Sequence, residues 1–280
     1  MNEHPLHNLS SLHLNNNDFR EHGLFSVAMA KILMQCSYLK HLNLHSCRLG
    51  GSVFEETSPL RAALQASCVS SIDISDNCME GEQLVGNFFN SVNHKTVKTV
   101  DISRTIRATD SFDMTRVWTA LSRLDNIKDV SLSGLPNRMS GDFSCATLEH
   151  LNLQYQDQDG CYLSEMSRRC LQLSHLTHLD PSFSNSVDNA LFEMLLQDLQ
   201  RNSTLKTLLL KCCAIRSPLN SLVFDSFPCV FDNCLSCLDI SFNDISSDDM
   251  DLFLEKWKGV VPSVEDENFK YGKCIFRVLK

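Results

Sequence analysis

The chain lacks long apolar runs and clusters of consecutive basic residues. No apolar stretch in its 280 residues approaches the roughly 18 residues that a membrane-spanning helix needs. Its polar beginning, MNEHPLHNLSSLHLNNN, has no apolar core of a secretion signal. With 25 Lys and Arg residues against 34 Asp and Glu residues, the formal net charge is −9 and no Lys/Arg run occurs. These absences predict an intracellular protein of the cytoplasm or nucleus that is not secreted, enters no membrane and does not bind nucleic acid directly.

Signatures of catalytic and cofactor sites are also missing. We find no phosphate-binding loop, no G-x-S-x-G or H-E-x-x-H motif and no dinucleotide-binding fingerprint. The spacing of Cys229, Cys234 and Cys237 is the only one that suggests a metal, and zinc needs about four converging ligands. The sequence therefore predicts no enzyme activity, no cofactor and no metal site.

Cysteine, in contrast, is abundant, but its distribution argues against a disulfide framework. The 13 cysteines are odd in number and scattered, and several, such as Cys47 and Cys213, stand where a small buried apolar residue is expected. Free cysteine is among the most buried residue types in proteins. We therefore predict free thiols and a reducing compartment.

The dominant positive feature is a repeated pattern, apolar-x-x-apolar-x-apolar, at a spacing close to 29 residues. Successive copies are separated by 30, 30, 28, 30, 21, 28, 29 and 30 residues. A period of this size is typical of a solenoid, because one unit is too small to bury its own apolar face. The nine copies begin at Leu9, Leu39, Val69, Val97, Ile127, Leu148, Leu176, Leu205 and Leu235.

The best-defined copies extend into a longer motif, L-x-x-L-x-L-x-x-N/C-x-apolar. Examples are LSSLHLNNNDF from Leu9, LKHLNLHSCRL from Leu39 and LSCLDISFNDI from Leu235. This motif resembles the leucine-rich repeat, and a period of 28 to 30 with a helix in each unit resembles its ribonuclease-inhibitor type. The resemblance implies an α/β leucine-rich-repeat solenoid, a horseshoe with a parallel concave β-sheet and convex helices. We expect about nine repeats over residues 1–258 and a C-terminal cap over residues 259–280.

The ninth residue of each repeat is expected to turn the chain at the end of the strand. An Asn side chain there can hydrogen-bond backbone groups that would otherwise be buried without partners. Repeats four to seven lose this residue type, and Pro181 removes a strand donor, so we expect a local irregularity between Val97 and Leu205. The Asn or Cys residues are Asn17, Cys47, Asn77, Cys213 and Asn243, and their replacements are Thr105, Leu135, Gln156 and Ser184.

The repeat register also predicts which side chains point out of the sheet. They are the third, fifth and seventh residues of each repeat, with the eighth at the rim. On the later repeats these positions combine acidic residues and histidines with an apolar and aromatic band, which suits a basic or mixed-polarity protein segment. The alternatives are that exposed strand positions are polar in any case, and that the cap or loops bury the rings. The candidate protein-binding residues are Tyr155, Phe183, Leu209, Phe242, Asp180, Asp239, His150 and His178.

Three functional hypotheses follow from this surface. The leading one is an interaction scaffold or adaptor that binds a partner protein through the concave sheet and the C-terminal half of its rim. The second is the substrate-recognition module of a ubiquitin ligase. The third, from a different class, is a GTPase-activating protein, for which Arg48 and Arg104 are candidates by location alone.

Overall fold

The computed structural model forms two compact units, Met1–Leu148 and Glu149–Lys280. It describes residues 8–20, 22–77, 79, 82–106, 115–135, 145–155, 168–233 and 235–258. The cap expected over residues 259–280 lies outside this set, as does the ninth-position Gln156. Within the described segments, no helix combines the length and the apolar character needed to cross a membrane.

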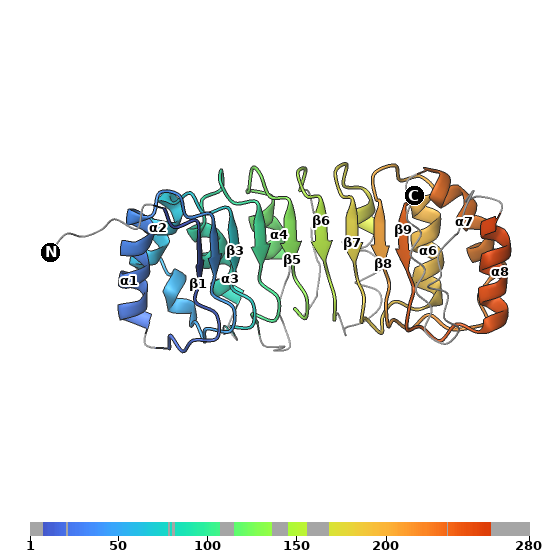
Figure 1. Ribbon diagram of the computed structural model, residues 1–280, viewed down its shortest axis with the longest axis horizontal. Coiled ribbons are helices and arrows are strands. Elements are labelled where there is room, and N and C mark those ends of the chain that lie inside the picture. The colour runs from blue at the N-terminus through green and yellow to red at the C-terminus, as the bar shows by residue number, and fades with distance from the viewer. Residues whose placement is uncertain are drawn as a thin grey trace. The chain divides into compact units, whose positions relative to one another are not determined.

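The first unit alternates short parallel strands with helices (Figure 1). Its strands pair in chain order, and each residue faces the same repeat position on the next strand, as Leu12, Leu42 and Ile72 do. Each of the α-helices contacts the next one along the chain. The strands are β1 (Ser11–His13), β2 (His41–Asn43), β3 (Ser71–Asp73), β4 (Thr99–Asp101) and β5 (Asp129–Ser131), and the helices are α1 (His22–Gln35), the 3₁₀ helix η1 (Gly51–Phe54), α2 (Pro59–Ala66), α3 (Glu82–Ser91) and α4 (Thr115–Leu121).

The second unit repeats this arrangement. Its strands are also parallel and paired in chain order, and α7 contacts both α6 and α8. In both units every strand begins at the third residue of a predicted repeat. The strands are β6 (His150–Asn152), β7 (His178–Asp180), β8 (Thr207–Leu209) and β9 (Cys237–Asp239), and the helices are α6 (Asn189–Leu199), α7 (Ser221–Asn233) and α8 (Ser247–Lys258).

The alternation of apolar and polar residues explains where the core lies. From the second repeat on, the fourth and sixth residues are buried, whereas the third residue of every repeat, which begins the strand, stays at least partly exposed. Inward side chains of neighbouring strands therefore stack on one another and on the helices. Full burial of an aliphatic side chain contributes roughly 1.5 to 3 kcal/mol, and this stacking supplies most of the stability of each unit.

Pro181 shortens one strand pairing. In the preceding repeat the sixth residue, Leu153, donates its N–H to the carbonyl of Asp180 in the next repeat, at 2.8 Å. Proline has no N–H, so β7 cannot make the equivalent bond to β8. The pairing of these two strands accordingly ends at Leu179 and Leu208.

Asn77, at the ninth position, joins two repeats through its side-chain amide. Its Oδ1 accepts the N–H groups of Cys47 and Leu49 at 2.9 and 3.0 Å. Its Nδ2 donates to the carbonyls of Leu44 and Ile74 at 2.8 and 2.6 Å. Asn77 is only 2% exposed, so none of these backbone groups would find water in its place. The predicted role of the ninth-position Asn is confirmed.

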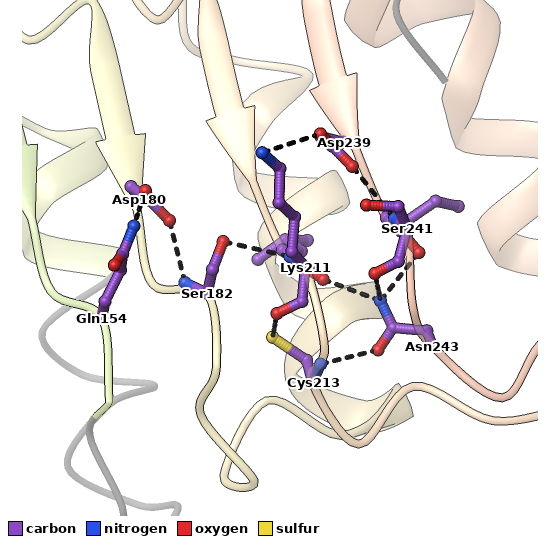
Figure 2. Close-up of polar contacts among 10 residues, drawn as sticks. Gln154, Asp180, Ser182, Lys211, Cys213, Asp239, Ser241 and Asn243 are labelled. Carbon is purple, nitrogen blue, oxygen red and sulfur yellow. Dashed lines mark hydrogen bonds and ion pairs between the residues drawn. The ribbon is translucent and has the colours of Figure 1, made fainter. Parts of the chain in front are cut away.

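The second unit carries the same bonds, and other residue types substitute for part of them. Asn243 accepts the N–H of Cys213 at 3.0 Å (Figure 2) and donates to the carbonyl of Leu210 at 2.7 Å. Thr105 lacks an amide, and its hydroxyl donates to the carbonyl of Ile74 at 3.2 Å. Loss of Asn in a middle repeat therefore reduces the number of bonds at the turn without removing the turn.

We expect Asn77→Ala to lower the free energy of unfolding by about 3 kcal/mol, because it leaves buried N–H and carbonyl groups unpaired. Urea unfolding followed by circular dichroism measures the change. Asn17→Ala is the matched control: Asn17 is exposed and donates to the carbonyl of Leu14, so its removal should cost well under half as much. Equal losses for the two variants would contradict the assigned role of Asn77.

Candidate functional site

The fifth residues of the repeats, predicted to face a partner, first of all hold the strand ends together. In six repeats an Asn or Asp at this position accepts the backbone N–H two residues later, at 2.8 to 3.0 Å. Such side-chain turns are a common role of these residue types. The recurrence of Asn or Asp at one register position was the sequence signal for this role. The six residues are Asn43, Asp73, Asp101, Asn152, Asp180 and Asp239.

Asp239 departs from the expectation of an exposed acidic residue. It is 5% exposed, and its Oδ2 lies 3.2 Å from Nζ of Lys211 on the neighbouring repeat (Figure 2). Asp180 is half-buried and accepts the side-chain amide of Gln154 at 2.5 Å. Lys211 and Gln154 are the seventh residues of their repeats, and the sequence pattern did not show that they reach across to these carboxylates.

His150 and His178 are brought together by the strand register. They occupy the third position on β6 and β7 and face each other directly. Their ring centroids lie 4.2 Å apart with the planes at 84°, an edge-to-face contact. His178 is exposed, and its Nδ1 lies 2.8 Å from the hydroxyl of Thr177. The two histidines therefore form one polar and aromatic surface on the second unit.

The eighth residue of every repeat adopts the left-handed backbone conformation, with φ between 49° and 65°. This conformation costs an ordinary L-residue roughly 1 to 2 kcal/mol, and Gly, Asn and Asp tolerate it best. The first unit mostly follows this preference, whereas the second carries three aromatic residues. The eighth residues are Asn16, Ser46, Asp76, Arg104 and Gly134 in the first unit and Tyr155, Phe183, Cys212 and Phe242 in the second.

Tyr155, Phe183 and Phe242 form what we call the aromatic band. Tyr155 and Phe242 are 48% and 52% exposed, and Phe183 is half-buried. The rings of Tyr155 and Phe183 are stacked, with centroids 4.9 Å apart and planes 11° from parallel. About half of the surface of Tyr155 and of Phe242 is therefore exposed.

Two other residues complete this surface. Leu209, the fifth residue of its repeat, is a half-buried apolar side chain at a position where Asp180 and Asp239 stand in the flanking repeats. Cys212 is exposed at the eighth position, between Phe183 and Phe242 in repeat order. Large hydrophobic groups in a polar surrounding are typical of interface anchors.

Asp101 shows how closely the acidic side chains of the first unit are packed. Burial raises the pKa of its carboxyl group, and the nearby Asp73 raises it further. The bonds from Ser103 act in the opposite direction. The ionised carboxylate is therefore less stable here than in the unfolded chain.

The cysteines of the described segments are all free, but not all are buried. Burial raises the pKa of Cys170 to about 12 and that of Cys213 to about 11, which keeps both thiols protonated and unreactive. Of the two cysteines expected to be buried, Cys47 is buried and Cys213 is half-buried, whereas Cys68, Cys212 and Cys229 are exposed. Among the described residues, no three His, Cys, Asp or Glu side chains converge as a metal site would require.

Comparisons with known proteins support a leucine-rich repeat without distinguishing its type. A family model described as Leucine Rich repeat matches residues 232–253, and no curated protein sequence matches the chain. The crystal structure of a TLR13–ssRNA13 complex contains a similar fold, with a TM-score of 0.53 and 18% identity. That match covers 86% of this chain and 34% of the other, so this chain spans about a third of that protein's length.

A second solved structure, the Rad7 and Elc1 complex in yeast, gives a TM-score of 0.39 and 15% identity, covering 70% of this chain and 42% of the other. The order of strands and helices within each unit and the first of these matches agree with the prediction. The fold is an α/β leucine-rich-repeat solenoid.

We expect Asp101→Asn to raise the free energy of unfolding at pH 7, because the amide keeps the bond from Ser103 and removes a desolvated charge. The folded-state pKa of Asp101 lies above the unfolded value, so the advantage shrinks as the pH falls through the folded-state pKa, and it disappears only well below pH 4, where the carboxyl is protonated in both states. Asp101→Ala, which loses the bond as well, should cost about 1 kcal/mol. Urea titrations at pH 7 and pH 4 test the assignment, and a pH-independent difference would contradict it.

We expect Phe242→Asn to raise the free energy of unfolding by about 1 kcal/mol, since Asn tolerates the left-handed conformation and half of the lost ring is already exposed. The reverse exchange at the equivalent position of the first repeat, Asn16→Phe, should lower it by a similar amount. Thermal and urea unfolding measure the change in the free energy of unfolding for both variants. Destabilisation by Phe242→Asn would show that the ring serves the fold.

Proposed function

We propose that this leucine-rich-repeat protein is an interaction scaffold or adaptor, which binds a partner protein through the aromatic band and the outward strand face of its second unit. The observation that carries the proposal is the presence of three aromatic side chains in the left-handed conformation. A non-glycine residue in this conformation costs of order 1 to 3 kcal/mol, and such strain gathers at functional sites. Exposed aromatic rings are also the side chains that most often dominate binding energies.

The surroundings of the band favour a partner of basic or mixed polarity. Asp239 is compensated by Lys211, whereas Asp180 meets only amide and backbone donors in the described part of the chain. The His150–His178 pair adds aromatic and hydrogen-bonding surface on the same unit. A partner that brings both apolar anchors and positive charge would complement this face.

The proposal also includes the type of repeat, the C-terminal cap and the cellular location. The periods of 28 to 30 residues support the ribonuclease-inhibitor type of repeat over residues 1–258, with residues 259–280 as its cap. The free cysteines support a location in the cytoplasm or nucleus.

The two arginines considered for GTPase activation are engaged within the first unit. Arg48 pairs with Asp18, with Nη1 and Oδ2 3.0 Å apart. Arg104 packs its stem over Gly134, where an added Cβ would lie 2.8 Å from its Cγ. Neither arginine therefore supports the GTPase-activating hypothesis.

We expect the double variant Phe183→Ser with Phe242→Ser to lose at least tenfold in the recovery of bound partner proteins, because both ring anchors are removed. Affinity capture from cell extract with quantitative mass spectrometry measures this. Leu222→Ser is the matched control, because Leu222 is 50% exposed on α7 and lies outside the band.

Thermal unfolding accompanies the capture experiment and should change little in the double variant. Equal recovery of partners by the double variant and the wild type would refute the proposal. A collapse in the melting temperature of the double variant would also refute it, since the rings would then serve the fold.

A further inference from the structure

We infer that the segment captured by the aromatic band is a proline-rich stretch in the polyproline II conformation, flanked by basic residues. The inference rests on the proposed function and adds to it the class of partner. Four observations carry it: the spacing of the rings, the small residue between two of them, the hydrogen bonding of the backbone beneath them, and the charges beside them.

The spacing of the rings follows from the sheet. Neighbouring parallel strands lie about 4.8 Å apart, and the Tyr155–Phe183 centroid distance of 4.9 Å matches that value. Phe183 and Phe242 follow β7 and β9, two strands apart, which places them roughly 9 to 10 Å from one another. A polyproline II helix advances about 3.1 Å per residue, or about 9.3 Å between residues i and i+3. Every third residue of such a helix is therefore in register with these two rings.

A small residue interrupts the row of rings. Cys212 occupies the eighth position of the repeat between Phe183 and Phe242 and is exposed. We infer that one proline ring of the bound segment lies over this small residue, which we call the notch position, with an aromatic ring on either side. Proline-rich segments are commonly recognised by surfaces lined with aromatic side chains.

The backbone beneath the band offers little to an added strand. The N–H groups of Tyr155, Phe183 and Cys212 donate to the seventh-residue carbonyls of the next repeat, at 3.1, 2.7 and 2.9 Å. A partner that bound by strand addition would need such groups free. A polyproline II segment has no internal hydrogen bonds, and its proline rings supply the contact, so it suits a surface made of rings.

The charges beside the band select the flanks of the segment. Asp244, two residues after Phe242, is exposed, and Asp180 forms no ion pair with a described residue. The chain as a whole has a formal net charge of −9. Arg or Lys residues next to the prolines would therefore be attracted, and this attraction would weaken with salt.

The test uses the full chain and the fluorescein-labelled synthetic peptide Arg-Ala-Pro-Pro-Ala-Pro-Pro-Ala-Arg, with binding followed by fluorescence anisotropy. One comparison peptide has all prolines replaced by alanine, and another has both arginines replaced by glutamate. We expect the proline peptide to bind at least tenfold more tightly than the alanine peptide and about fivefold more tightly than the glutamate peptide at low salt. Equal binding of the proline and alanine peptides would overturn the inference.

Protein variants locate the binding. We expect two variants to weaken peptide binding at least tenfold each. Phe242→Ser removes one ring, and Cys212→Phe places a large side chain at the notch position. Leu222→Ser and Cys68→Phe make the matching changes at exposed residues that are not part of the band, and they should leave peptide binding unchanged. Circular dichroism checks folding, and Cys212→Leu replaces Cys212→Phe if the latter is unfolded. Peptide binding that is indifferent to the notch variant would overturn the inference.

The outcomes also separate this inference from the proposed function. If partner capture depends on Phe183 and Phe242 but the proline peptide does not bind, the proposed function stands and the inference fails. If neither partner capture nor peptide binding depends on these rings, the proposed function and the inference both fail. A labelled single-stranded oligouridine serves as a further probe, because stacked rings also bind bases. Tighter binding of the oligonucleotide than of the proline peptide would overturn the inference.

Discussion

The satisfaction of backbone hydrogen bonds between successive repeats is the constraint on which the rest of the structure depends. A three-residue strand cannot pair its own N–H and carbonyl groups, so each repeat donates to the next, as Leu44 does to Asp73 at 2.8 Å. Where the strands end, side chains take over this task. Asn77 supplies five such bonds, and the Asn or Asp at the fifth position supplies one in each of six repeats.

This constraint explains why the outward polar residues are only partly available to a partner. One oxygen of Asp180 accepts the N–H of Ser182, and the other accepts the amide of Gln154 (Figure 2). Asp239 is even less available to a partner, because it is buried and its charge is compensated by Lys211. The acidic face is therefore a hydrogen-bonded network first, and a source of electrostatic attraction only where a carboxylate has no cation beside it.

The same constraint creates the aromatic band. To return the chain after each strand, the eighth residue must adopt the left-handed conformation, and its side chain then projects at the strand end of every repeat. The first unit places mainly tolerant residue types there. The second unit has Tyr155, Phe183 and Phe242 there, although this conformation is strained for aromatic residues. A conformation that the fold requires thus presents aromatic side chains suited for binding.

The sequence by itself determined the repeat register, the start of each strand, the inward apolar columns and the role of the ninth-position Asn, because these depend on periodic positions that every repeat shares. It also placed Tyr155 and Phe242 on an exposed rim. Only the tertiary structure decided that Asp239 is buried against Lys211, that the two histidines touch, and that the eighth residues are left-handed. These features depend on which side chain of one repeat reaches which group of the next, and a pattern within single repeats carries no information about such distances.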